Sequence, residues 1–263
     1  MRQRSCAATI LPVPATRTLT YVGHSTVLLE LGGVRLLTDP LLRSRVAHLR
    51  RDAQPPAAEI RERIDAVLIS HLHYDHLDLA SLRLVRAPRV LVPRGAGELL
   101  DRARIAGVEE IGVGDVVEVG DVRIEAVPAD HGGRRRPGGP QAEPLGFVVG
   151  RSERIYFAGD TDVFEDMARL APVDVALLPV AGWGPKLGPG HMDASGAARA
   201  AALLRPRLAV PIHWGTFRPR TTRSGGWFTE PPLAFAASAA ELVPEMEVRV
   251  LEPGEALSLA SAA

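Results

Sequence analysis

A short apolar run that ends in a dense group of histidines and acids constrains this chain most. The run VLI at positions 67–69 predicts a buried strand, and the segment HLHYDH follows directly. Residues two apart in an extended chain point the same way, so His71 and His73 can bind one ion. Asp75 and His76, one turn further on, then face a second ion. A lone histidine is more often an ordinary core residue, but this grouping predicts a two-metal site.

Strand-length apolar segments recur along the chain and are separated by glycine and proline. We expect further strands at 18–23, 26–31, 34–38, 88–92, 145–150, 154–158, 173–180, 208–212, 247–251 and 256–259, with short β segments between 108 and 128. We expect helices at 79–85 with Asp78 as N-cap, at 95–106, at 163–170, from Asp193 to Leu204 and at 232–242. Residues 43–63, with a short helix after Pro56, and residues 132–144 are expected to be surface loops. This order of elements predicts an α/β fold.

Four of the predicted β segments end at a polar residue that can bind metal. These residues are His71, His131, Asp160 and His213. Strand ends converge at one edge of layered α/β folds, so the four ends predict one shared site. The chain shows no internal repeat and no linker. We therefore expect a flexible N-terminal extension over residues 1–16 and a single domain over residues 17–263.

The residue types at these ends suit two divalent ions. Two ions about 3.5–4 Å apart need a bridging ligand, and a carboxylate such as Asp160 has two oxygens for that purpose. The remaining ligands expected for one ion are His71, His73 and His131, and for the other Asp75, His76 and His213. Imidazoles and carboxylates without a thiolate suit Zn²⁺ best and also accept Mn²⁺ or Fe²⁺.

Such a centre predicts hydrolysis. Bound Zn²⁺ lowers the pKa of a water to about 7, so a metal-bridging hydroxide can act as nucleophile. The centre keeps a net positive charge, which favours an anionic or carbonyl-bearing substrate. Asp75 can orient the hydroxide and take its proton, and His191 in GPGHMD can contact substrate or protonate a leaving group. We expect cleavage of a phosphodiester or a lactone or other ester in a small or lipid-like molecule.

Two other polar residues each allow two interpretations. Asp39 follows an apolar strand in LLTDP and either accepts a hydrogen bond from a ligand histidine or forms an Asp-Pro turn. His24 in GHST either lies in the core behind the ligands or contacts substrate. The sequence leaves these alternatives open.

Aromatic and arginine residues near the site are equally open. Aromatic residues that either line an apolar pocket or pack beneath loops are Trp183, Trp214, Phe217, Trp227 and Phe228. The run from Arg134 to Arg136 either attracts an anionic group or is simply solvated.

Composition excludes some classes of partner. Thirty-one basic residues balance 31 acidic ones, which argues against a nucleic-acid partner. Cys6 is the only cysteine, so no intrachain disulfide is possible and a cytoplasmic location is expected. No long apolar run predicts a transmembrane segment, although peripheral membrane contact and the oligomeric state stay open.

The motifs together resemble the metallo-β-lactamase superfamily. HLHYDH matches its HxHxDH motif, and His131, GDTD at 159–162 and His213 follow in the expected order. The resemblance covers about residues 18–255. Blocks such as YVGHSTVLLE, LLTDP, FAGDTDVF and IHWGTF are similar to the branch of ascorbate-6-phosphate lactonase and N-acyl-phosphatidylethanolamine-hydrolysing phospholipase D.

This resemblance implies an αβ/βα sandwich of two mixed β-sheets flanked by helices, with a two-metal site at one edge between the sheets. It implies the same ligands: His71, His73, Asp75, His76, His131, Asp160 and His213. GHMDASGA has serine where the phospholipase pattern prefers proline, so the substrate does not transfer. The alternative to a hydrolase is a non-catalytic, metal-stabilised binding protein of the same fold.

Overall fold

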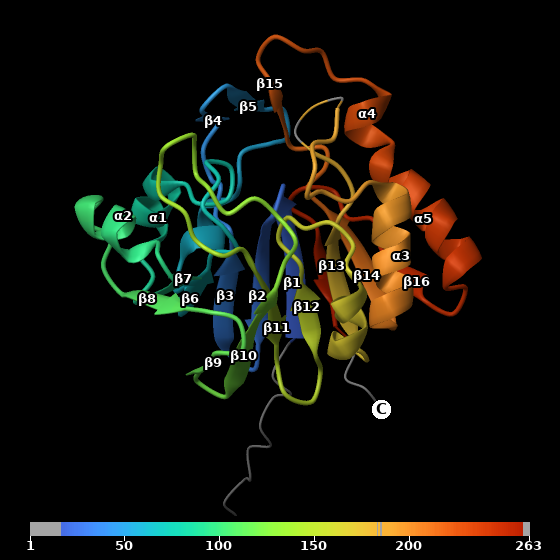
Figure 1. Ribbon diagram of the computed structural model, residues 1–263, viewed down its shortest axis with the longest axis horizontal. Coiled ribbons are helices and arrows are strands. Elements are labelled where there is room, and N and C mark those ends of the chain that lie inside the picture. The colour runs from blue at the N-terminus through green and yellow to red at the C-terminus, as the bar shows by residue number, and fades with distance from the viewer. Residues whose placement is uncertain (1–16, 183, 185, 260–263) are drawn as a thin grey trace, which may run out of the picture.

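Two mixed β-sheets form the framework of the molecule (Figure 1). The computed structural model describes residues 17–182, 184 and 186–259, and the expected extension over residues 1–16 lies outside them. Within the described residues the first sheet has seven strands, in the order β17 (Ala256–Ser258), β1 (Arg17–Gly23), β2 (Thr26–Leu31), β3 (Val34–Thr38), β6 (Ala66–Leu68), β7 (Arg89–Pro93) and β8 (Val108–Ile111). The pairs from β17 to β3 are antiparallel, and those from β3 to β8 are parallel.

The second sheet repeats this plan. Within the described chain it also has seven strands, in the order β16 (Glu247–Val248), β14 (Leu208–Ile212), β13 (Val175–Pro179), β12 (Ile155–Phe157), β11 (Leu145–Val149), β10 (Val122–Pro128) and β9 (Val116–Val119). Strands from β16 to β12 are parallel, and those from β12 to β9 are antiparallel. Each sheet is therefore mixed, as the resemblance implied.

Burial on both faces explains why the strand before the histidines has no polar alternation. Ala66 and Leu68 of β6 belong to the core between the sheets, whereas Val67 packs on the other face with the helices. A strand covered on both faces needs apolar residues at every position. β6 thus enters the site from the middle of a rigid, dry sheet.

Helices cover the outer face of each sheet. α1 (Leu79–Val85) and α2 (Gly97–Arg102) lie on one side of the molecule in Figure 1, and α3 (Ala194–Leu204) and α5 (Pro231–Leu242) lie on the other. Asp78 caps α1 by accepting a hydrogen bond from the Ser81 amide, and Asp193 caps α3 by accepting one from the Gly196 amide. Both predicted caps are confirmed, as is the αβ/βα sandwich. Within the described residues, no helix is both long and apolar enough to cross a membrane.

The prediction of a surface loop over residues 43–63 is wrong for residues 45–51. β4 (Arg45–Val46) and β5 (Leu49–Arg51) form a hairpin that pairs with β15 (Phe217–Pro219). A small separate core joins Leu41, Val46, Leu49 and Phe217. Arginines hide this apolar pattern, and the partner strand lies far along the sequence. The expected short helix after Pro56 is a 3₁₀ turn, Ala58–Arg61.

Two other helix predictions also need correction. The segment expected as a helix at 163–170 is a 3₁₀ helix over Glu165–Leu170 in which only Met167 is buried. The helix expected at 95–106 is confined to α2, and α4 (Gly226–Thr229) was not predicted. Short segments with few buried residues depend on tertiary contacts, which outweigh local helix propensity.

Candidate metal centre

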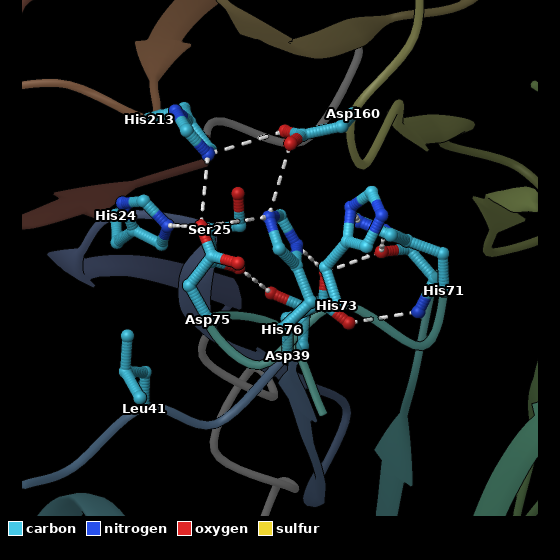
Figure 2. A network of polar contacts seen from close by, with 12 residues as sticks. His24, Ser25, Asp39, Leu41, His71, His73, Asp75, His76, Asp160 and His213 are labelled. Atoms are coloured by element: carbon cyan, nitrogen blue, oxygen red, sulfur yellow. Dashed lines mark hydrogen bonds and ion pairs between the residues drawn. The ribbon is translucent and has the colours of Figure 1, made fainter. Parts of the chain in front are cut away.

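The strand ends that the sequence pointed to meet at one edge of the sandwich. β6, β10, β12 and β14 end just before the expected ligands His71, His131, Asp160 and His213. Two further strands, β1 and β3, end beside them and deliver His24 and Asp39. The amide of His213 donates to the carbonyl of His24 at 2.8 Å, which joins the ends of the two sheets. Figure 2 shows the resulting cluster.

Three histidines form what we call the outer group: His71, His73 and His131. His73 Nδ1 lies 3.0 Å from His71 Nε2 and 3.0 Å from His131 Nε2. Burial lowers the pKa of all three imidazoles, that of His131 to about 4. Neutral imidazoles whose ring nitrogens converge are suited to bind one cation.

Four buried residues form the inner group: His24, Asp75, His76 and His213. Asp75 Oδ2 lies 3.9 Å from His76 Nε2 and 4.0 Å from His213 Nε2. His24 Nε2 lies 3.1 Å from the same oxygen, and burial lowers the pKa of His24 to about 3. The neutral His24 ring can therefore donate its Nε2 proton to Asp75 and hold that carboxylate toward the two histidines.

Asp160 is buried and lies next to members of both groups, His76 and His213 of the inner group (Figure 2) and His131 of the outer group. Its Oδ1 is 3.3 Å from His213 Nε2, and its Oδ2 is 3.2 Å from His76 Nε2. Burial alone would raise the pKa of Asp160, but the neighbouring histidines His213 and His76 outweigh it and hold the pKa well below its ordinary value. The group is therefore a carboxylate with one oxygen toward each histidine.

Buried atoms around Asp160 lack hydrogen-bond partners. Among the described residues these include Asp160 Oδ1, His76 Nε2 and His213 Nε2. An unpaired buried polar group is costly, so several such atoms facing one point need an explanation. A divalent cation satisfies lone pairs of this kind, and the N and O donor set suits a transition metal. The residues present therefore fit a metal ion.

Asp39 supports histidines of both groups from below. Its Oδ1 accepts a hydrogen bond from the Ser70 amide at 2.7 Å, and its Oδ2 accepts from the Ser70 hydroxyl at 2.5 Å and from His76 Nδ1 at 2.7 Å. Ser70 Oγ lies 3.0 Å from His71 Nδ1 and can accept its proton. Both histidines then present Nε2 to the centre. Of the two interpretations of Asp39, the structure favours the acceptor.

The loop that carries His191 closes the outer side. His131 Nδ1 donates to the Gly190 carbonyl at 2.6 Å, which leaves Nε2 facing the centre. Gly190 has φ +73°, and a Cβ there would lie 3.0 Å from His131 Nδ1, so only glycine fits without strain. His191 Nε2 lies 3.4 Å from Asp160 Oδ2, and its Nδ1 faces the carbonyls of Gly188 and Pro189. The expected catalytic residues Asp75 and His191 both reach the cluster.

Known proteins share the pattern. Residues 34–214 match the model described as beta-lactamase superfamily domain. A UPF0173 metal-dependent hydrolase of Methanopyrus kandleri is 33% identical over 249 residues, covering 90% of this chain and 97% of the relative. One of Opitutus terrae is 35% identical over 257 residues, covering 92% and 99%. This chain belongs to the UPF0173 metal-dependent hydrolases of the metallo-β-lactamase superfamily. The narrower resemblance to the lactonase and phospholipase branch stays a prediction.

Solved structures show the same fold as this hydrolase. Igni18, a metallo hydrolase from Ignicoccus hospitalis, is similar with a TM-score of 0.73 and 25% identity over 94% of this chain and 100% of its own. CmlA, a diiron β-hydroxylase from Streptomyces venezuelae, gives a TM-score of 0.74 at 20% identity, covering 95% of this chain and 55% of its own. The second match shows the fold alone, since proteins with unlike chemistry share it.

The outer group, the inner group and Asp160 are together called the metal cluster below. A cavity of about 280 Å³ opens over this cluster in the hydrolase. It is lined by Val46, Ala47, His48, Leu49, His73, Tyr74, Asp75, Arg135, Asp160 and His191. Of the five aromatic residues proposed as a pocket lining, none of the four that the structure describes is among them. Trp214, Phe217 and Phe228 are buried in packing beneath the loops, Trp227 packs edge-on against Phe228, and Trp183 lies outside the described residues. The apolar wall comes instead from the β4–β5 hairpin.

One arginine of the run at 134–136 stabilises the loop that carries His73, Asp75 and His76, a role that the sequence did not reveal. Arg135 is buried and donates from one nitrogen to the carbonyls of Leu72 and Leu77, at 2.6 and 3.1 Å. Its guanidinium lies 4.1 Å from the centre of the Tyr74 ring. The neighbouring arginines are exposed. The loop expected to be fully exposed is therefore anchored by its middle arginine, and nothing in a run of three arginines says which one turns inward.

Proposed function

We propose that this metal-dependent hydrolase binds two divalent ions and cleaves a phosphodiester or a lactone or other ester bond in a small or lipid-like substrate. The observation that carries the proposal is the position of Asp160, whose carboxylate lies next to His76 and His213 of the inner group and next to His131 of the outer group. A carboxylate placed in this way suits a bridge between ions about 3.5–4 Å apart. Ions held by these residues would supply a Lewis acid and would lower the pKa of a bound water to about 7.

The ligand assignment follows the two groups. We assign His71, His73, His131 and Asp160 to one ion, and Asp75, His76, His213 and Asp160 to the other. Imidazole and carboxylate donors without thiolate favour Zn²⁺, with Mn²⁺ or Fe²⁺ as alternatives. Metal analysis of the purified protein should give two ions per chain, and one ion per chain at saturating zinc would contradict the dinuclear proposal.

Two side chains that line the cavity carry the proton transfers. Asp75 receives a hydrogen bond from His24 on Oδ2, so its other oxygen is available to take a proton from the attacking water. His191 Nε2 lies on the opposite side, beside Asp160, where it can protonate the leaving group. Attack and departure are thus served from two sides of one cavity.

A substrate panel tests the reaction. Model lactones and bis-p-nitrophenyl phosphate are assayed with the zinc-loaded and the manganese-loaded enzyme. We expect turnover of one class, and Asp75→Ala should abolish it while circular dichroism shows the fold retained. Absence of turnover with every member and both metals would contradict the proposed chemistry.

The role of His191 is tested by leaving-group dependence. A general acid contributes typically about 10²–10⁴-fold, and mainly when the leaving group is basic. His191→Gln should therefore slow an alkyl leaving group far more than p-nitrophenolate. Equal losses on both substrates would show that His191 positions the site and does not donate a proton.

The setting of the enzyme is part of the proposal. The single cysteine supports a cytoplasmic location, and the balanced charge supports a small-molecule or lipid-like substrate over nucleic acid. A gel-shift titration with DNA and RNA should show no retardation at physiological salt.

A further inference from the structure

A second cavity adjoins the one over the metal cluster. It has a volume of about 380 Å³ and is lined by His48, Pro219, Arg220 and Thr221. His48 lines both cavities, so they meet at this residue. We call this second cavity the outer cavity. The amide of Arg220 donates to the carbonyl of His48 at 3.1 Å, which attaches the wall of the outer cavity to the β4–β5 hairpin. A substrate long enough to occupy both cavities would run from Asp160 past His48 to Arg220, and we call this route the path.

The two cavities differ in chemistry. The cavity over the metal cluster, which we call the inner cavity, has an apolar wall from Val46 and Leu49 and the half-exposed ring of Tyr74. The outer one has Arg220 as its charged residue. A molecule that fills both therefore needs an apolar segment next to the reacting bond and a polar end beyond it.

The surface around the outer cavity has an excess of positive charge. Residues 43–52 and 217–223 carry seven arginines, Arg43, Arg45, Arg50, Arg51, Arg218, Arg220 and Arg223, against one acid, Asp52. Ion pairs occupy Arg43, Arg50 and Arg218. Arg51 binds the Leu41 carbonyl and lies over the Phe217 ring.

Three of these arginines are exposed and form no ion pair within residues 17–182, 184 and 186–259: Arg45, Arg220 and Arg223. Uncompensated arginines at the mouth of a cavity attract and hold anions. Arg220 is the one that lines the cavity itself.

We propose that the hydrolase selects substrates in which a short apolar segment joins the cleaved bond to a negatively charged group, and that Arg220 binds this group. The inference rests on the proposed function, because it takes the cavity over the metal cluster as the place of reaction. It adds the order of the substrate parts along the path: reacting bond, apolar segment, anion. It also commits to a single soluble molecule as the occupant.

Matched probes test the inference by binding. Suberate and 8-hydroxyoctanoate have the same length and share one carboxylate for the metal cluster, but differ in the charge at the far end. Isothermal titration calorimetry on the zinc-loaded protein should show suberate binding about tenfold tighter, the size of one charged hydrogen bond. The series from adipate to sebacate should show an optimum length.

Variants of Arg220 test whether this side chain causes the tighter binding of suberate. Arg220→Ala should remove the preference for suberate and leave 8-hydroxyoctanoate unchanged, and Arg220→Lys should keep most of it. Arg102→Ala is the control, since Arg102 is exposed on α2, away from both cavities. No preference for suberate at any length, or a preference that Arg220→Ala leaves intact, would overturn the inference.

The outcomes separate this inference from the proposed function. A preference for suberate without turnover of lactones or the phosphodiester would support the path and refute the chemistry. Turnover without the preference would do the reverse. Sedimentation with phosphatidylcholine vesicles that contain phosphatidylglycerol tests a membrane surface as the alternative ligand of Arg220. Vesicle binding that Arg220→Ala abolishes, with no suberate preference, would assign the arginine to a membrane surface and overturn the inference.

Discussion

The outer and inner groups of the metal centre are built in different ways. All four members of the inner group are buried, and carboxylates hold its histidines: Asp39 contacts His76, and Asp75 contacts His24. In the outer group only His71 is buried, and the support comes from the Ser70 hydroxyl and the Gly190 carbonyl. A carboxylate in a dry environment orients a histidine more strongly than a neutral acceptor does. The inner group is therefore the more rigid half, although each group places one residue in the cavity wall, His73 from the outer group and Asp75 from the inner group.

Asp160→Asn should have the largest effect, because the Asp160 carboxylate lies next to His76 and His213 of the inner group and next to His131 of the outer group. The loss in metal affinity and activity should exceed the roughly 10–100-fold cost typical of residues that only support a ligand. Metal content by mass spectrometry and kcat/KM should both fall. Asp162→Asn, the same charge change two residues further on, is the control. Loss of one ion with the other retained would show that Asp160 belongs to one group.

Asp39→Asn should come next. The amide nitrogen of asparagine cannot accept the hydrogen bonds that Ser70 and His76 now donate to Asp39. We expect a roughly 10–100-fold weaker metal affinity, with both groups affected because His71 depends on Asp39 through Ser70. Competition with a chelator measures it, and Asp121→Asn on an exposed turn is the control. If the outer group kept its full affinity, the link through Ser70 would be wrong.

Gly190→Ala should have the smallest effect and reach only the outer group. The left-handed φ costs alanine about 1–2 kcal/mol of unfolding free energy. The new Cβ would also press on His131 Nδ1 at 3.0 Å. Gly32→Ala separates the two effects, because Gly32 has φ +63° and nothing within 4 Å of the added Cβ. Both variants should unfold more easily by thermal melting, but only Gly190→Ala should weaken zinc binding. Equal zinc affinities would contradict the packing argument.

Much of the fold was predictable because local signals agreed with the tertiary structure. β2, β3 and β14 begin and end at the residues that the sequence predicted, and α1 and α3 begin at their predicted caps. An apolar strand that is buried on both faces can be recognised from its own residues, without knowledge of the strands that it pairs with. The β4–β5 hairpin was missed since its third strand, β15, lies about 170 residues away, and pairing at that separation leaves no local pattern.

In the site, too, some features could be predicted from the sequence and others could not. Sequence alone pointed to the seven expected ligands, which the structure brings together, because histidine and aspartate clustered at strand ends have few other uses. It did not reveal the role of Arg135 or the second cavity beside His48, on which the proposed path rests. Those features depend on which way a side chain turns and which distant segments pack against it. Only the tertiary structure decides this, because the direction of a loop side chain follows from contacts across the chain and not from its neighbours in sequence.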